Sequence, residues 1–485
     1  MLSTAGEEQI VGSLHELSVG QAAVAIRSGA LTSEAYAEAL LDRCRQHEDL
    51  RAFITLSEAD VLAEARKADK KRSSGVSLGP LHGVPIAIKD SINTRGTPTS
   101  LGTSILSKFT PDRDAGVVTA LREAGAILFG KNNLVEMSYG LMGTNAHHGQ
   151  PRNPYDKGRV TGGSSSGAGA AVAARLVPAA IGGDTVGSIR VPSSLCGVVG
   201  FRPSSGRWPS DGIAPIASTF DTAGPMARTV EDCALIDSVM TRDLFDASGS
   251  SNLKGVRLGY APKQHLDLID PDVERAFRAA LQGLSEAGAE IVEVNFQDDF
   301  SSLVLRANWR VFRYETMPHI TRHLEISNMP VTFREIYEQL GPDVKHLWDD
   351  AVMPGGPNVV SDLEYDEAIK VIRPELMRQY AELYSKNRID ALLLPSTPTV
   401  APPISSVSEI EIAGQLVHYR AIGRNVIPSS CAGLPGINLP IGLSAGGLPI
   451  GLEIDGQQGR DTRLLEIAMS VSKILGQIPA PSLAE

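Results

Sequence analysis

The chain has 485 residues, of which 42% are hydrophobic and 5% aromatic, a composition typical of a globular protein with a large aliphatic core. The net charge is −11 and the sequence has no run of five or more basic residues, so we expect no nucleic-acid partner. The four cysteines lie far apart and form no CxxC pair, which indicates reduced thiols and argues against a zinc site.

Membrane and export signals are absent from the sequence pattern. Residues 1–20 lack a basic segment followed by an apolar one, so we expect no signal peptide. The longest tract of small and apolar residues, 168–182, is interrupted by Arg175 and Pro178 and is too short to span a bilayer. The sequence therefore predicts a cytoplasmic protein that uses no membrane and no bound metal.

Helical and strand-like segments alternate along the chain. Thr32 or Ser33 opens a capping box for a helix over 31–46, and Asp270 with Pro271 marks the start of a helix–glycine–strand unit over 271–296. The other predicted elements are a strand at 83–90, a helix and a strand over 115–131, and strands at 255–262 and 388–398. This order predicts an α/β protein with a mixed sheet covered by helices.

Residues 297–367 differ from the rest of the chain. The segment is rich in aromatic residues and histidines, is mostly helical in pattern, and is broken by "MPGGPN" at 353–358. We expect it to form a lid or an interface.

The stretch "GGDTVGSIRVPSS" (182–194) places Ser188 directly after Gly187. Glycine allows backbone N–H groups to crowd around a reacting atom, so a serine there is typical of a nucleophile. A hydroxyl needs a base to take its proton, and histidine is the usual one. The nearest histidines, His148 and His265, are far away in sequence.

A second glycine-rich stretch is "TGGSSSGAGAAVAARLVP" (161–178). It lacks the lysine of a phosphate-binding loop and the third glycine of a dinucleotide fingerprint. Gly163, Ser165 and Gly167 match GxSxG, but a nucleophile elbow follows a buried strand and the preceding residues here are polar. We favour a tightly packed loop of backbone and hydroxyl groups at a helix N-terminus.

Lys89 ends the predicted strand 83–90. Such a lysine is often snorkelling or paired with a carboxylate, and Asp90 beside it keeps that interpretation open. If Lys89 is enclosed, desolvation lowers its pKa and makes the neutral amine available as a base. A lysine could then take the Ser188 proton through an intervening hydroxyl.

Taken together, "GVPIAIKD", "GGSSSG" and "GDTVGSIRVPSSLCGVVGFRPSSGRWP" resemble the signature of the amidase signature family of serine hydrolases. The resemblance extends to "LFGKNNLVEMSYGLMGTN" and to "AGLPGINLPIGLSAGGLPIGLEIDG", and we expect residues 297–367 to lie outside it. It implies one α/β domain over 1–485 with a mixed, mostly parallel sheet. Within that domain we expect N-terminal helices (1–75), a signature core (76–240), the lid-like helical insertion (297–367) and the C-terminal part of the core (388–475).

The resemblance also implies a mechanism that uses no cofactor. Ser188 would be the nucleophile, Ser164 a bridging serine on a cis peptide bond, and Lys89 the base. Asp184 and Arg190 would brace the loop. The oxyanion hole would consist of the backbone N–H groups of Thr185, Val186, Gly187 and Ser188.

Three positions depart from the family pattern. Val186 stands where most members have glycine, Gly183 where they have threonine or serine, and Ser166 where they have glycine. Because the hole uses backbone donors, valine is acceptable at 186 if that residue does not require a positive φ.

The implied substrate is a small amide, anilide or carbamate, because the motifs are most similar to the arylacetamide-hydrolysing branch. Candidate pocket residues are Tyr139, Gly140, Arg207 and Trp208. One alternative is the amidase subunit of a glutamyl-tRNA amidotransferase, against which Val191 counts because glutamine is usual there. Another is a catalytically inactive scaffold protein. A homodimer is left open.

Overall fold

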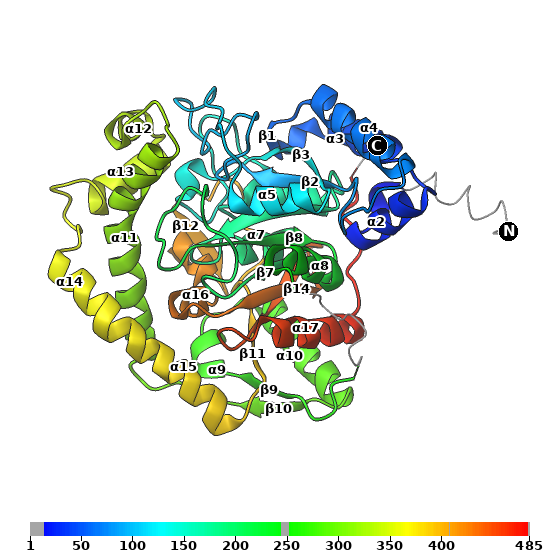
Figure 1. Ribbon diagram of the computed structural model, residues 1–485. Coiled ribbons are helices and arrows are strands. Elements are labelled where there is room, and N and C mark those ends of the chain that lie inside the picture. The colour runs from blue at the N-terminus through cyan, green and yellow to red at the C-terminus, as the bar shows by residue number, and fades with distance from the viewer. Residues whose placement is uncertain (1–13, 244–251, 407, 484–485) are drawn as a thin grey trace.

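The centre of the protein is a large β-sheet. The computed structural model describes residues 14–243, 252–406 and 408–483, and within them this sheet has eleven strands (Figure 1). Residues 1–13, on which the signal-peptide prediction partly rests, lie outside the described residues. In spatial order the strands are β1 (Phe53–Thr55), β3 (Ile127–Asn132), β2 (Pro85–Lys89), β6 (Ala179–Asp184), β8 (Thr222–Ala227), β7 (Val199–Arg202), β14 (Gly436–Leu443), β15 (Pro449–Asp455), β11 (Ala391–Pro395), β9 (Arg257–Tyr260) and β10 (Glu290–Glu293).

The prediction of a mixed sheet is confirmed, but the prediction that it is mostly parallel is wrong. Of the ten neighbouring pairs that the described strands form within this sheet, six are antiparallel and four are parallel. The parallel pairs lie toward the two ends of the sheet, where the sequence has helix–strand units that supply the crossovers parallel pairing requires. The middle of the sheet, from β6 to β11, is antiparallel throughout.

Two groups of helices pack on this sheet. One group consists of α6 (Ser166–Ala173) and α7 (Arg190–Cys196). The other consists of α5 (Gly116–Glu123), α8 (Val230–Thr241), α10 (Pro271–Glu286) and α17 (Asp461–Leu475). Strands β2, β8, β11 and β15 are buried along their whole length, which requires cover on both faces.

The predicted element boundaries agree closely with the structure. Helix α3 (Ser33–Gln46) occupies the segment predicted as 31–46, but the expected capping box is replaced by a simple cap, in which Thr32 accepts from the Ala35 N–H. Ser33 instead donates its hydroxyl to the Gly83 carbonyl. Asp270 caps α10 and Pro271 is its first residue, as predicted.

The remaining N-terminal helices are α2 (Val19–Ser28) and α4 (Glu58–Ser73), and the short helix α9 (Pro262–His265) follows β9. Two small hairpins complete the described strands, β4 (Arg152–Asn153) with β5 (Asp156–Val160), and β12 (Glu409–Ile412) with β13 (Gln415–His418).

Residues 297–367 are helical, as their pattern predicts. They form α11 (Phe300–Ile326), α12 (Phe333–Gln339), α13 (Pro342–Ala351) and α14 (Asp362–Glu367), followed by α15 (Arg373–Asn387). In Figure 1 these yellow-green and yellow helices run along one side of the molecule, opposite the blue N-terminal helices. The Trp348 ring stacks on Phe333 and meets Tyr139 edge-on, so the segment shares a hydrophobic core with the residues around position 139.

Candidate active site

Lys89 and Ser164 form a buried hydrogen-bonded pair. Lys89 is the last residue of β2, and Ser164 lies in the loop before α6. The Lys89 Nζ donates to Ser164 Oγ over 2.7 Å, and the two residues are only 2% and 1% exposed. The Gly163–Ser164 peptide bond is cis, as the resemblance implied. The two residues that the motifs single out 75 positions apart are therefore in direct contact.

Lys89 forms no ion pair within the described part of the chain. Asp90, the partner that the sequence left open, lies 3.1 Å from the Lys131 Nζ and accepts from the Ser100 N–H. Burial lowers the pKa of Lys89 to about 7, although Asp184 and Asp221 oppose the shift. Near neutral pH the amine is therefore deprotonated in a large fraction of molecules.

Ser188 lies on the short turn between β6 and α7, at the edge of the sheet where the parallel strands β2 and β6 both end. It is 3% exposed and lines a cavity, so a small molecule can approach it. Ser165, the centre of the GxSxG alternative, is completely buried. Its hydroxyl is bonded to both the N–H and the carbonyl of Gly183, which counts against a reactive role.

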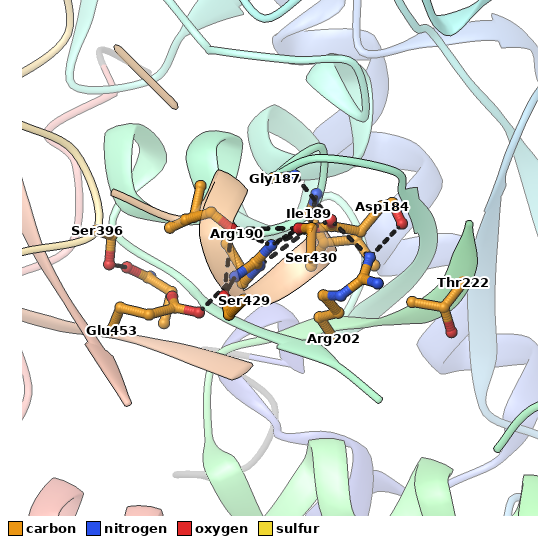
Figure 2. A network of polar contacts seen from close by, with 12 residues as sticks. Asp184, Gly187, Ile189, Arg190, Arg202, Thr222, Ser396, Ser429, Ser430 and Glu453 are labelled. Atoms are coloured by element: carbon orange, nitrogen blue, oxygen red, sulfur yellow. Dashed lines mark hydrogen bonds and ion pairs between the residues drawn. The ribbon is translucent and has the colours of Figure 1, made fainter. Parts of the chain in front are cut away.

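Asp184 holds the turn that carries Ser188. Its carboxylate accepts from the N–H groups of Gly187 (2.7 Å) and Ile189 (3.1 Å), and from the guanidinium groups of Arg190 and Arg202 (Figure 2). Burial by itself raises the pKa of Asp184, but the two arginines outweigh it and hold the pKa well below the ordinary range. Asp184 is therefore a fixed anion that shapes the turn.

Arg190 connects this turn to the C-terminal part of the sheet. In Figure 2 it lies between Asp184 and Glu453, with Ser429 and Ser430 close by. It donates to Glu453 over 2.9 Å and to Ser429 over 3.0 Å. Burial raises the pKa of Glu453 and of its neighbour Asp455.

Two further carboxylates, Glu453 and Asp455, lie 2.9 Å and 3.9 Å from the Arg190 guanidinium. Asp184 and Arg190 were predicted as braces, but Arg202, Ser429, Ser430 and Glu453 were not. The spacing of these residues along the chain does not indicate that they would contact Arg190 or Asp184.

The backbone donors around Ser188 are not equivalent. The Gly187 N–H already donates to Asp184, whereas the N–H groups of Thr185, Val186 and Ser188 make no hydrogen bond to the described residues. Val186 is not among the residues with positive φ, so the condition under which valine is acceptable there is met. Gly187 has φ +115°, and a Cβ at this position would lie 2.6 Å from Val426 Cγ2.

Asp221 supports the same turn from a different segment. One carboxylate oxygen accepts from the Thr185 hydroxyl over 2.6 Å, and the other accepts from the N–H groups of Ile216 and Ala217. Burial raises the pKa of Asp221. The role of Asp221 was not predicted.

Two cavities meet at this site. The smaller, about 40 Å³, is lined mainly by apolar and aromatic side chains, among them Phe312 and Trp309, together with Ser188 and Val186. We call it the acyl-side cavity, after the substrate group that we propose for it. The larger, about 680 Å³, contains Lys89 on its wall, and we call it the nitrogen-side cavity, because in the implied relay Lys89 returns the proton to the leaving nitrogen. Ser138, Thr185 and Ile216 line both.

The predicted pocket residues are divided between these cavities. Tyr139 and Gly140 line the acyl-side cavity, and Trp208 lines the nitrogen-side cavity. Arg207 lines neither of the two. It forms an ion pair with Asp237, which also accepts from the Trp208 indole N–H over 2.7 Å, so its placement is that of a brace for the Trp208 ring.

The histidines nearest to Ser188 in the sequence are engaged elsewhere. His147 Nε2 lies 2.7 Å from Glu136, and His148 Nε2 lies 3.3 Å from the Thr103 carbonyl. His265 is buried against Phe296, and burial lowers its pKa to about 3. Within the described ranges no group of three or more His, Cys, Asp or Glu side chains could hold a metal ion. No helix in those ranges is both long and apolar enough to cross a membrane.

The comparisons with known proteins agree with this architecture. A family model described as Amidase matches residues 35–465. This range includes the helical segment 297–367, so the expectation that the segment lies outside the resemblance is wrong. A curated relative, mandelamide hydrolase from Pseudomonas putida, is 38% identical, with 97% of this chain and 93% of the relative covered. Indoleacetamide hydrolase from Rhizobium radiobacter is 35% identical over 90% of this chain and 93% of its own length.

Two further matches are an amidotransferase subunit and a solved structure. A relative from Roseiflexus sp. (strain RS-1), named as one of the subunits of glutamyl-tRNA(Gln) amidotransferase, is 34% identical over 95% of this chain and 97% of its own length. A crystal structure described as that of an amidase superposes with a TM-score of 0.85 at 30% identity, covering 95% of this chain and all of the other. The α/β architecture and the sequence together define a hydrolase of amide C–N bonds. The chain belongs to the amidase family, as its motifs predicted.

Gly187→Ala tests whether the turn geometry matters for amide hydrolysis. The added Cβ requires an unfavourable φ and meets Val426, so the turn must shift. We expect kcat/KM for an aryl amide to fall by about 100-fold or more, because misplaced donors lose transition-state stabilisation. The matched control is Gly255→Ala, where φ is +83° but the Cβ meets nothing within 4 Å. Equal activities of the two variants would contradict a role of this turn in amide hydrolysis.

Proposed function

We propose that this amidase cleaves small aryl amides through an acyl-enzyme on Ser188, with Ser164 as the bridging hydroxyl and Lys89 as the base. The observation that carries the proposal is the enclosed hydrogen bond from Lys89 to Ser164, formed by an amine whose pKa burial lowers to about 7. A base with a pKa near the working pH is the most effective one for proton transfer.

The proton moves along a chain of three groups. Neutral Lys89 accepts the Ser164 proton while Ser164 accepts that of Ser188, and the Ser188 oxygen bonds to the carbonyl carbon as the carbonyl electrons move to its oxygen. When the C–N bond breaks, the proton returns through Ser164 to the leaving nitrogen. Water then attacks the acyl ester through the same relay, which releases a carboxylic acid and restores Ser188. No cofactor enters these steps.

We assign the oxyanion hole to the N–H groups of Thr185, Val186 and Ser188. These three have no acceptor among the described residues, whereas the Gly187 N–H, which the resemblance included, is held by Asp184. In this proposal Gly187 contributes its backbone conformation and Asp184 fixes the turn. Asp221 then positions Thr185 through its hydroxyl.

The lining of the acyl-side cavity favours an aromatic or apolar acyl group, although the cavity, about 40 Å³ in volume, must widen to admit an aromatic ring. Tyr139 and Phe312 lie with ring centroids 4.9 Å apart beside Val186, and aromatic groups pack well against such rings. The names of two of the relatives, mandelamide and indoleacetamide hydrolase, also refer to aryl amides. A carbamate presents the same electrophile to Ser188, so a urethane stays within the proposed substrate class.

Residues 297–367 contribute to both cavities, which supports the lid-like role that we propose for them. Trp309 and Phe312 line the acyl-side cavity, and His319 and His323 line the nitrogen-side cavity. The alternative of a glutaminase that works inside a complex would require partner chains for activity, and Val191 in place of the usual glutamine counts against it. A cytoplasmic location and a homodimer stay predictions.

Labelling of Ser188 tests the nucleophile. A fluorophosphonate should modify Ser188 in the wild-type protein, as mapped by mass spectrometry of peptides, and Ser188→Ala should abolish both labelling and amide turnover. Ser165→Ala serves as the control and should keep the label at Ser188. Modification of Ser165 in the wild type would contradict the proposal and favour the GxSxG alternative.

The pH dependence tests the base. Only the neutral amine accepts a proton, so kcat/KM should rise with pH through about 7 and level above it. Because histidine titrates ordinarily near 6.5, the profile alone does not identify the group, and substitutions must do so. Lys89→Ala should lower amide hydrolysis by about 10³-fold or more and spare ester hydrolysis, since an alkoxide leaves with less help from a proton donor.

The control for this experiment is the joint replacement of His147 and His148 by alanine. It should keep the acid limb of the profile, because both rings are bonded away from Ser188. Loss of the acid limb in the double variant, together with amide turnover by Lys89→Ala, would show that a histidine is the base.

A further inference from the structure

The acyl-side cavity is smaller than the acyl group that we propose for it. Its volume is about 40 Å³, whereas an apolar cavity that holds benzene measures about 150 Å³. Many of the side chains that line it are buried in one hydrophobic core, among them Tyr139, Phe312 and Ile427. Because such a core is closely packed, the room for an aromatic ring must come from a different part of the wall.

A third cavity lies on the other side of one wall residue. It measures about 340 Å³ and is lined by residues of α11 and of the segment 357–360, and we call it the surface cavity. Among the described residues, Trp309 alone lines both the surface cavity and the acyl-side cavity. Farther along α11, Phe312 lines only the acyl-side cavity and Arg313 lines only the surface cavity. The Trp309 side chain therefore separates the two cavities.

The Trp309 ring is held only by weak contacts. It is half-buried, and its indole N–H makes no hydrogen bond with the described residues, whereas the Trp208 N–H donates to Asp237. The guanidinium carbons of Arg420 and Arg313 lie 4.7 Å and 5.5 Å from the centroid of the Trp309 ring. Cation–π contacts at such half-buried positions are weak, so the ring can turn toward the surface cavity without losing a hydrogen bond.

The surface cavity can receive an apolar chain. Its apolar lining residues, other than Trp309, are Leu305, Pro357, Val359 and Val360. Leu305 is 60% exposed and Val359 is 42% exposed. The three arginines that line the cavity already form ion pairs, Arg306 and Arg310 with Glu367 and Arg313 with Asp350. An apolar chain in this cavity therefore covers exposed hydrophobic surface without separating a charge from its partner.

We propose that Trp309 determines the size of the acyl group that the enzyme accepts, because its ring separates the acyl-side cavity from the surface cavity. A phenyl group beside Ser188 makes room by displacing this ring toward the surface cavity, and an acyl group with a longer chain must displace it further. This inference rests on the proposed function and specifies the acyl group.

A series of primary amides with the same leaving group tests the role of Trp309. The members are phenylacetamide, 4-phenylbutanamide and 6-phenylhexanamide, which differ only in the length of the chain between the phenyl ring and the carbonyl. The readout is the ratio of kcat/KM for 6-phenylhexanamide to that for phenylacetamide. Trp309→Ala should raise this ratio by about tenfold or more over the wild type, since burial of two further methylene groups accounts for such a factor. Trp309→Phe, which keeps a smaller ring, should raise it by less.

Phe312→Ala is the matched control. It also enlarges the acyl-side cavity, but Phe312 does not line the surface cavity, so the ratio should stay close to that of the wild type. A ratio in Trp309→Ala no higher than that in Phe312→Ala would overturn the role of Trp309. If Trp309→Ala does not fold, an unchanged ratio in Trp309→Phe would overturn it. A wild-type protein that hydrolyses none of the three amides would contradict the proposed function, and this inference with it.

Discussion

The complete enclosure of the Lys89 amine, without a carboxylate bonded to it, is the constraint on which the site depends. A buried ammonium normally pairs with an acid, and Asp90 is the adjacent residue. Asp90 lies in the turn that follows β2 and faces Lys131, whereas Lys89, the last residue of the strand, faces Ser164. The result is an amine whose pKa is lowered to about 7 by desolvation and whose one hydrogen-bond partner among the described residues is a hydroxyl.

Asp184, which precedes Ser188, is also buried, but unlike the Lys89 amine it is paired with opposite charges. Its carboxylate is paired with Arg190 and Arg202 and bonded to two backbone N–H groups, so it stays ionised and immobile. Removing one partner of such a buried pair leaves an uncompensated charge, which is why the network fixes the turn so firmly. Arg190 extends this rigidity to Glu453 on β15. The amine that we propose as the base therefore lies beside a rigid network of buried charged residues.

Local patterns predicted much of the fold, and the motifs predicted the contact between Lys89 and Ser164. Helix α10 begins at Pro271 because Asp270 caps it, and that signal is local. The antiparallel middle of the sheet was not predicted, because strand direction there depends on which strands the fold places side by side, and the neighbours β6, β8, β7 and β14 are out of chain order. Arg202, Glu453 and Asp221 were missed for a related reason. Each acts through a partner that only the fold brings near, as Glu453 does with Arg190 across 263 positions.

The most direct test of the account is a measurement of the Lys89 pKa itself. NMR of protein labelled with ¹³C or ¹⁵N in its lysine side chains follows the titration of each amine, and the spectrum of Lys89→Met assigns the resonance that is lost. The account predicts that Lys89 titrates near pH 7 in the free enzyme. A Lys89 pKa at or above the ordinary lysine value of about 10.4 would contradict it, because the amine would then be protonated at neutral pH and could not act as the base.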